Sequence, residues 1–223
     1  MKKKCDYILL IMNCKNYKHK ALQQKNTWLK YLPNYIKYFH VIGDKTLCEN
    51  NETEYIINND ENILYVNTKD DYNSLPSKVI QSFNVINKEY EYKYIFKTDD
   101  DQMLTQPTFF DTFIKLLASR NPITYYGGFS ISVKSHISSY YMEHDCLPRD
   151  LLLEETTYCN GRFYLLHCKA VENLLTKKDE ISKKYIEDHA IGYFLDNSFK
   201  ENLLHFDNKK MFTDLPIQSH SGK

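Results

Sequence analysis

Short apolar runs alternate with amphipathic segments through the first half of the chain. The runs are rich in Ile, Leu, Val, Phe and Tyr, and they span residues 7–13, 38–43, 63–66 and 92–98. Residues 20–31, 74–88 and 109–119 read as helices; in the second of these, Val79, Phe83 and Ile86 lie four and three positions apart. Strands separated by helices pair mainly in parallel. We therefore expect an α/β fold with a mostly parallel central sheet flanked by helices.

The helix expected over residues 20–31 is half-buried. Leu22, Trp28 and Leu29 would form its apolar side, and Pro33 would stop it. Trp28 is the single tryptophan of the chain and lies on this side. We therefore expect Trp28 in the core rather than as a platform on which a sugar ring stacks.

The second half of the chain is less regular. We expect a strand over 124–133 with a bend at its two glycines, an irregular excursion over 145–157, and a short helix over 169–175. The stretch 158–167, YCNGRFYLLH, is expected to turn at Gly161 and then run into a strand. Glu187 and Asp188 open a further helix, where the helix dipole favours acidic side chains. Capping explains one acid there more readily than two acids beside His189.

Three consecutive aspartates, Asp99, Asp100 and Asp101, follow the strand that ends at residue 98. All three carboxylates are ionised near pH 7, and adjacent negative charges repel unless a cation lies among them. In parallel sheets, ligands bind beyond the carboxyl ends of the strands. If the chain stays extended, Asp99 and Asp101 face one side and Asp100 the other, so one cation could meet two carboxylates. A solvated surface turn is the alternative that the triplet leaves open.

Composition limits the class of protein and its partners. The chain has 223 residues, of which 42% are hydrophobic and 14% aromatic, and we find no linker, so we expect one folded domain over residues 1–223. The 29 basic and 29 acidic residues balance. Nothing in this net charge favours a nucleic acid or an anionic membrane as a partner.

The apolar run at residues 7–12 is too short to span a bilayer, and no cleavage site for a signal peptide follows it. We therefore expect no transmembrane segment and a cytoplasmic location. The six cysteines show neither C-x-x-C pairs nor zinc-finger spacing, which indicates reduced thiols. Cys159 is expected to be an unreactive small residue, and a bridge between Cys146 and Cys159 stays open.

Short motifs follow one another at residues 25–28, 41–43, 70–78, 96–104, 158–161 and 187–192. Together and in this order, along nearly the whole chain, they resemble the family of β-1,3-galactosyltransferases and Fringe-type N-acetylglucosaminyltransferases, which have the GT-A fold. The matching stretches are residues 25–28 and 41–43 (that family's R-x-T-W and F-V-L-G), 70–78 (D-x-Y-x-N-L-T-x-K), 96–104 (K-x-D-D-D-x-F), 158–161 (Y-C-S-G) and 187–192 (E-D-V-x-x-G). The chain departs from the family at Ala21, at residues 74–76 and at 160–164. These departures leave the donor sugar and the acceptor unassigned.

The resemblance implies a role for each motif. Asp99 and Asp101 would hold Mn²⁺ or Mg²⁺, which neutralises the diphosphate of the donor. Asp100 would contact hydroxyls of the ribose or the donor sugar, and Lys78 would belong to the nucleotide site. Asp188 would be the general base that takes the proton of the acceptor hydroxyl, which leads to inversion at the anomeric carbon.

The C-terminal residues also resemble the family pattern. His220 would be the third metal ligand, while Gly222 and Lys223 would contact the diphosphate of the nucleotide-sugar donor. His205 competes for the role of metal ligand, but it lies in an apolar run and is expected to be a core histidine.

The expected function is that of a metal-dependent, inverting glycosyltransferase. It would move a sugar from a UDP-sugar to a hydroxyl group of a glycan, glycoprotein or glycolipid. Residues 1–104 would form the nucleotide-binding half of the domain, and residues 105–223 the acceptor-binding half. Two alternatives remain: a metal-dependent phosphoesterase or nuclease that uses the same carboxylates, and a non-catalytic carbohydrate-binding domain with a glycosyltransferase-like fold.

Overall fold

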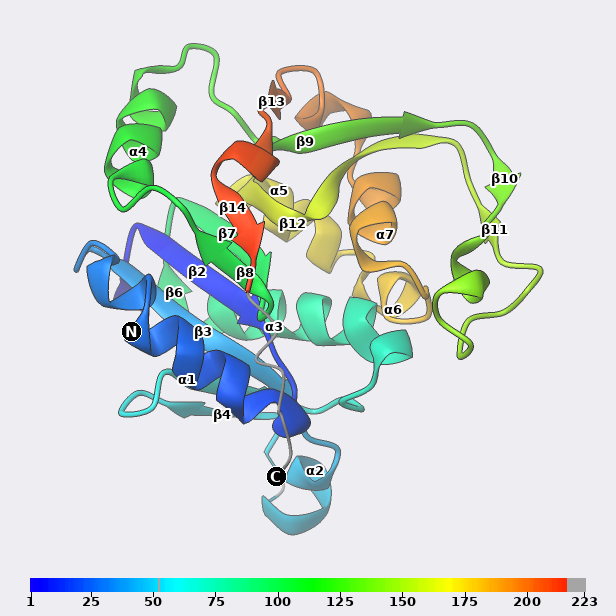
Figure 1. Cartoon of the computed structure of the whole chain (residues 1–223), viewed down its shortest axis with the longest axis horizontal. Helices are drawn as coiled ribbons and strands as arrows, with labels where there is room; N and C mark the ends of the chain where they lie inside the picture. The colour runs from blue at the N-terminus through cyan, green and yellow to red at the C-terminus, as the bar shows by residue number, and fades with distance from the viewer. Residues whose placement is uncertain (52, 216–223) are drawn as a thin grey trace, which may run out of the picture.

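The computed structural model describes residues 1–51 and 53–215. Within them, an eight-stranded sheet runs through the molecule in the order β13-β9-β12-β7-β2-β3-β5-β4 (Figure 1). Its strands are β2 (Tyr7–Met12), β3 (Ile36–Gly43), β4 (Tyr55–Asn58), β5 (Ile63–Val66), β7 (Tyr94–Asp99), β9 (Tyr126–Val133), β12 (Thr156–His167) and β13 (Leu204–His205). The four strands β7, β2, β3 and β5 pair in parallel, whereas β12 pairs antiparallel with β7 and with β9. The expected α/β fold with a mixed, mostly parallel sheet is confirmed.

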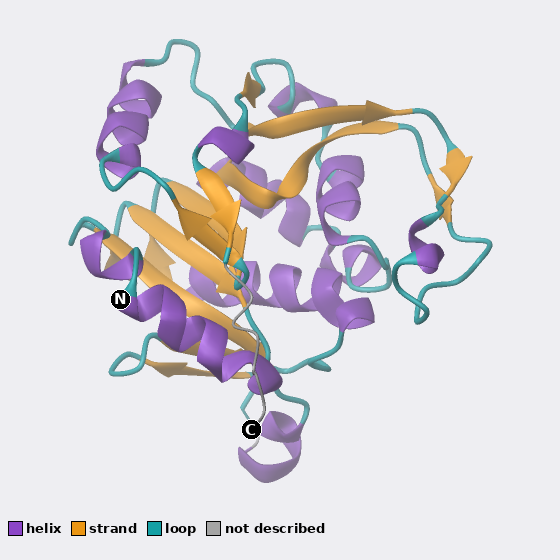
Figure 2. Cartoon of the chain, viewed as in Figure 1, coloured by secondary structure: helices purple, strands orange, loops and turns teal. Residues whose placement is uncertain are grey.

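Helices cover both faces of the sheet (Figure 2). The helices of the described residues are α1 (Lys18–Asn26), α2 (Thr46–Asn51), α3 (Leu75–Glu89), α4 (Phe109–Ser119), α5 (Cys168–Leu175), α6 (Lys178–Ile181) and α7 (Glu187–Phe194), of which α2 projects beyond the edge of the sheet (Figure 1). In β2, Ile8 and Leu10 belong to the core cluster that includes the buried side of α3, while Leu9 and Ile11 belong to the cluster that includes α4. Side chains alternate between the two faces of a strand, so a strand that is covered on both faces is apolar throughout.

Helix α1 ends earlier than the sequence suggests. Its last residue is Asn26, and the hydroxyl of Thr27 donates to the carbonyl of Gln23. Leu22 lies on the exposed side of α1 with 58% of its surface accessible, so its assignment to an apolar stripe is wrong. Trp28 and Leu29 follow the helix and are buried. The prediction that Trp28 belongs to the core is confirmed, and its buried position comes from the turn after α1 rather than from the helix.

Strand β12 does not turn at Gly161, contrary to the sequence prediction. It is one strand whose pairing with β9 shifts, because Cys159 opposes Ser130 while Tyr164 opposes Gly128. Between these two pairs, four residues of β12 face a single residue of β9, and the surplus bulges out of the ladder. This bulge carries Asn160, Gly161 and Arg162.

Further short strands pair outside the eight-stranded sheet. β1 (Lys3–Lys4) pairs with β6 (Tyr90–Glu91), β10 (His136–Ile137) pairs with β11 (Leu152–Leu153), and β8 (Gln102–Leu104) pairs with β14 (Phe212–Asp214). β11 lies inside the stretch that was expected to be irregular. Through β14, the end of the described chain reaches the acidic triplet, where the N–H of Leu215 donates to the carbonyl of Asp101. Among the described residues, no helix has the length and apolar character needed to cross a membrane.

Candidate active site

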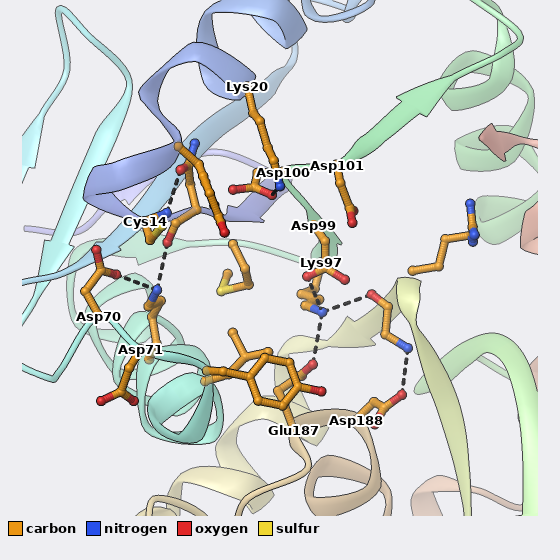
Figure 3. Close-up of a pocket in the computed structure, with 18 of the residues that line it drawn as sticks. Cys14, Lys20, Asp70, Asp71, Lys97, Asp99, Asp100, Asp101, Glu187 and Asp188 are labelled. Atoms are coloured by element: carbon orange, nitrogen blue, oxygen red, sulfur yellow. Dashed lines mark hydrogen bonds and ion pairs between the residues drawn. The ribbon is translucent and has the colours of Figure 1, made fainter. Parts of the chain in front are cut away.

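A cavity of about 670 Å³ lies where β2 and β7 end. Side chains from α1, α3, the β7–β8 turn, the β12 bulge and the start of α7 line it (Figure 3). The cavity contains Lys78, Asp99, Asp100, Asp101 and Asp188, which are the site residues predicted within the described part of the chain. The fold therefore brings together groups that lie 110 positions apart in the sequence.

The acidic triplet forms a turn rather than an extended segment. Asp99 is the last residue of β7, and Asp100 and Asp101 form the turn that precedes β8. The premise that placed Asp99 and Asp101 on one side and Asp100 on the other is wrong, because all three line the cavity. The alternation of strand geometry ends where the strand ends.

Neutral side chains hold the main chain of this acidic turn, defined as residues 99–101. The amide nitrogen of Gln24 donates to the carbonyl of Asp99 at 3.1 Å and to that of Gln102 at 2.8 Å. The indole N–H of Trp28 donates to the same Gln102 carbonyl at 3.1 Å. Gln24 and Trp28 are both buried. Helix α1 and the turn after it therefore fix the path of the acidic turn without using its carboxylates.

Two carboxylates of the acidic turn form ion pairs. Oδ1 of Asp99 lies 2.8 Å from Nζ of Lys97, and Oδ1 of Asp100 lies 3.1 Å from Nζ of Lys20. Burial raises the pKa of Asp99 and of Asp100 to about 6, although the lysine beside each one acts in the opposite direction. The side chain of Asp101 instead accepts from the neutral amide of Gln102. The turn thus carries more negative charge than its lysines neutralise.

Lys97 is buried between the acidic turn and α7. Its ammonium lies 2.8 Å from Asp99, 2.9 Å from Oε2 of Glu187 and 2.9 Å from the carbonyl of Gly161 (Figure 3). Burial alone would lower the pKa of Lys97, but the two carboxylates more than offset it and raise the pKa. Glu187 also accepts a hydrogen bond from the hydroxyl of Tyr164. Glu187 therefore pairs with a cation in the site, whereas capping had been the simpler interpretation of an acid at this helix end.

Asp188 lies beside this pair at the start of α7. Its Oδ2 accepts from the N–H of Gly161 at 2.9 Å, and its Oδ1 accepts from the N–H of His189 at 2.8 Å. Burial raises the pKa of Asp188, while Lys97 and the two N–H donors act against burial. The result is a carboxylate with a fixed orientation and a raised proton affinity at the cavity wall.

Lys78 projects from α3 at the opposite end of the cavity. Its ammonium donates to the carbonyl of Asn13 at 2.7 Å and to Oδ1 of Asp70 at 2.6 Å. Asp70 also accepts from the backbone N–H groups of Gly43 and Lys15. Lys78 thus ties together the segments that follow β2, β3 and β5, and its predicted contact with a nucleotide stays a prediction.

The histidine and cysteine predictions have mixed outcomes. His205 is exposed on β13, where Nδ1 contacts the hydroxyl of Ser130, so the expectation of a core histidine is wrong. Its short strand lies at the end of the sheet, away from the residues that line the cavity. His220, Gly222 and Lys223 lie outside the described residues. All six cysteines are free, which excludes the bridge between Cys146 and Cys159, and burial raises the pKa of Cys159 to about 12.

Sequence reasoning missed the basic partners of the acidic residues. Lys20 and Lys97 each pair with an aspartate of the turn, and Arg162 pairs with Asp214 at 2.9 Å. A signal existed for Lys97, because a lysine inside the otherwise apolar strand YIFKT needs a buried partner. Lys20 and Arg162 carried no comparable signal.

The sequence profile of the galactosyltransferase family matches residues 19–199, which span the cavity residues from α1 to α7. The chain belongs to the galactosyltransferase family. It is therefore a glycosyltransferase of the hexosyltransferase class, and the resemblance to this family stated from its motifs is confirmed. No curated protein matches the chain.

Solved glycosyltransferase structures resemble the chain at low sequence identity. The bifunctional glycosyltransferase WbbM, in its apo form, has a TM-score of 0.49 and 10% identity, with 92% of this chain and 39% of WbbM covered. A glycosyltransferase involved in glycosylation of the major capsid of PBCV-1 has a TM-score of 0.48 and 10% identity, with 98% of this chain and 96% of that chain covered. The galactosyltransferase LgtC, in complex with donor and acceptor sugar analogs, has a TM-score of 0.46 and 10% identity, with 91% of this chain and 74% of LgtC covered.

Proposed function

We propose that this family member is a metal-dependent, inverting glycosyltransferase that moves a sugar from a UDP-sugar to a hydroxyl group of a glycan, glycoprotein or glycolipid. The observation that carries the proposal is the shared cavity of the acidic turn and Asp188. The acidic turn suits a diphosphate with its cation, and Asp188 suits an acceptor hydroxyl that must lose a proton.

The donor atoms of the acidic turn fit a hard divalent cation. Asp99 and Asp101 supply carboxylate oxygens, which Mn²⁺ and Mg²⁺ prefer. Burial is the main cause of the raised pKa values of Asp99 and Asp100, and neighbouring carboxylates add to it, while Lys97 and Lys20 only partly offset it. Among the described residues, no three His, Cys, Asp or Glu side chains are grouped to hold a metal by themselves. Donor phosphates, water and His220 are the ligands that we propose to complete the set.

When bound, the cation would neutralise the diphosphate leaving group. The residues of the chain then have separate tasks. Asp188 takes the proton of the acceptor hydroxyl, and its raised pKa makes it a stronger base than an exposed aspartate. The N–H groups of Gly161 and His189 donate to the carboxylate of Asp188 and fix its orientation. Asp100 and Lys78 are proposed to contact the donor, together with Gly222 and Lys223.

Nucleotide binding tests the donor half of the proposal. We expect UDP to raise the melting temperature of the purified protein only with Mn²⁺, and more than GDP or CMP does, because a ligand of the native state stabilises it by mass action. Asp101→Ala should abolish this shift. The matched control is Asp179→Ala, because Asp179 lies exposed on α6 outside the cavity. If no nucleotide shifts the midpoint, the phosphoesterase becomes the leading hypothesis, and hydrolysis of p-nitrophenyl phosphate would then support it.

Product stereochemistry tests the acceptor half. A base opposite the leaving group predicts that the new glycosidic bond has the anomeric configuration inverted from the donor, which NMR spectroscopy of the product detects. A retained configuration would rule out Asp188 as the base of a single displacement. Binding of UDP without transfer to any hydroxyl acceptor, or to water, would favour the non-catalytic carbohydrate-binding domain.

A further inference from the structure

The ammonium of Lys97 has a complete set of directed contacts. A lysine ammonium has three N–H donors. Those of Lys97 face Asp99, Gly161 and Glu187 at 2.8, 2.9 and 2.9 Å. The three acceptors come from β7, from the β12 bulge and from α7 (Figure 3). Three separate elements therefore meet at one nitrogen atom.

Each acceptor connects directly to a group in the proposed reaction. Asp99 belongs to the acidic turn. Gly161 accepts from Lys97 through its carbonyl and donates its N–H to Asp188. Glu187 is the residue before Asp188 in the chain. Lys97 thus contacts the donor side of the cavity directly, and it reaches the carboxylate of Asp188 through the bulge and through the helix.

Charge balance alone does not explain this geometry. A lysine that only neutralised Glu187 and Asp99 would need no contact with the uncharged carbonyl of Gly161. That contact holds the bulge of β12, a strand segment whose ladder with β9 is interrupted at this point. The hydroxyl of Tyr164 also donates to the carboxylate of Glu187, so Lys97 links the bulge to a carboxylate that has a second hydrogen bond of its own.

We propose that Lys97 is a positioning residue that sets where Asp188 lies relative to the acidic turn, and thereby aligns the acceptor hydroxyl with the donor. The catalytic part of this inference rests on the proposed function. The positional part concerns the ligand-free protein and is independent of it.

Hydrogen exchange of the ligand-free protein tests the positional part. In Lys97→Met, which keeps the length of the stem and removes the donors, we expect amides in residues 158–163 and 187–193 to exchange about tenfold faster than in the wild type. Lys93→Met is the matched control, because the ion pair between Lys93 and Asp6 is exposed and lies outside the cavity. Unchanged exchange of both segments in Lys97→Met would overturn the proposal.

Kinetics test the catalytic part. We expect Lys97→Met to lower kcat about 100-fold, because a small displacement of a base is costly, while the Kd for UDP with Mn²⁺ changes less than about tenfold. The double variant Lys97→Met/Glu187→Gln removes the pair of Lys97 and Glu187 together, so the buried carboxylate of Glu187 is not left without its cation. We expect kcat of the double variant to stay low. A kcat restored to the wild-type value would reduce Lys97 to a counter-charge for Glu187 and overturn the proposal.

The outcomes for the two proposals are separable. If the wild type neither binds UDP nor transfers a sugar, the proposed function fails, and hydrogen exchange still decides whether Lys97 positions the bulge and α7. If the wild type is active and Lys97→Met shows wild-type exchange and kcat, the role of Lys97 fails while the proposed function stands.

Discussion

Nζ of Lys78 and Oδ1 of Asp70 are 2.6 Å apart, and only 4% of the lysine side chain is exposed. The pair joins α3 to the segment after β5, and Lys78 also donates to the carbonyl of Asn13. A buried ion pair that loses one partner leaves a charge without compensation in a poorly solvated place. The pair is therefore structural as well as part of the cavity wall.

Lys78→Met is expected to lower the free energy of unfolding by about 3–5 kcal/mol, because it leaves the carboxylate of Asp70 unpaired. Lys88→Met is the matched control on the same helix. Its pair with Glu54 is largely exposed, so its loss should cost less than about 1 kcal/mol. Urea unfolding of the two variants measures the difference. Equal stabilities would show that the buried pair is not structural.

Transfer activity should depend on pH through Asp188. The base acts only when deprotonated, and burial raises its pKa, so kcat is expected to fall as the pH drops through a value above the ordinary value of about 3.9. The measurement is a kcat profile at saturating UDP-sugar, acceptor and Mn²⁺. Asp188→Asn should lower kcat by about 100-fold or more, with UDP binding preserved. If Asp188→Asn kept kcat and the same acid limb, another group would be the base.

His40 should make the protein less stable in acid. It is buried with Nε2 against Oε1 of Gln24, and burial lowers its pKa to about 3. In the unfolded chain, His40 has a pKa near 6.5 and binds a proton at a pH where His40 of the folded chain stays neutral. The stabilisation is therefore complete above about pH 6.5 and is lost as the pH falls toward 3, with a slope of up to about 1.4 kcal/mol per pH unit.

Urea unfolding at several pH values between 7.5 and 4 isolates this contribution. Carboxyl groups with raised pKa values, such as that of Asp99, act in the opposite direction, so the informative quantity is the difference between wild type and His40→Gln. We expect a shallower loss of stability in acid for His40→Gln. His205→Gln is the control, because His205 is exposed on β13. Parallel pH curves for all three proteins would contradict the assignment.

Gly192 permits the close approach of α7 to β12. A Cβ at this position would lie 2.2 Å from Cβ of Tyr158 and 2.9 Å from the carbonyl of Thr157. Gly192→Ala is expected to destabilise the protein by at least about 2 kcal/mol, because the helix has to move away from the strand. In Gly161→Ala, the added Cβ would lie 3.3 Å from Nζ of Lys97, a much longer contact than the one at Gly192, so thermal unfolding should show a smaller loss. A larger loss for Gly161→Ala would contradict this view of the packing.

The sequence was informative where one local pattern decides the structure. β2 is apolar in consecutive positions because Ile8 and Leu9 enter cores on opposite faces, and such a run predicts a buried strand. Helix α4 has the bounds predicted for it, Phe109–Ser119. The acidic triplet could be placed at the carboxyl end of β7, because ligands bind there in parallel sheets, and the resemblance to a known family placed Asp188 in the same cavity.

The sequence failed where the partner of a residue lies far along the chain. The bulge of β12 depends on its register with β9, which the sequence around Gly161 does not encode, and the glycine alone favours a turn. The three contacts of Lys97 involve residues up to 90 positions away, and no local period encodes them. α1 was predicted too long because Trp28 is buried by tertiary packing, and a buried residue next to a helix looks like part of it.

The path of the acidic turn depends on hydrogen bonds from Gln24 and Trp28 to the carbonyls of Asp99 and Gln102. Carbonyl groups are common to all residues, so these bonds do not use the side chains at positions 99–101. The backbone path of the turn and the chemistry of its side chains are therefore set by different groups. A library of Asp, Asn, Glu and His at the three positions could therefore be screened for altered cation or nucleotide preference on an unchanged backbone.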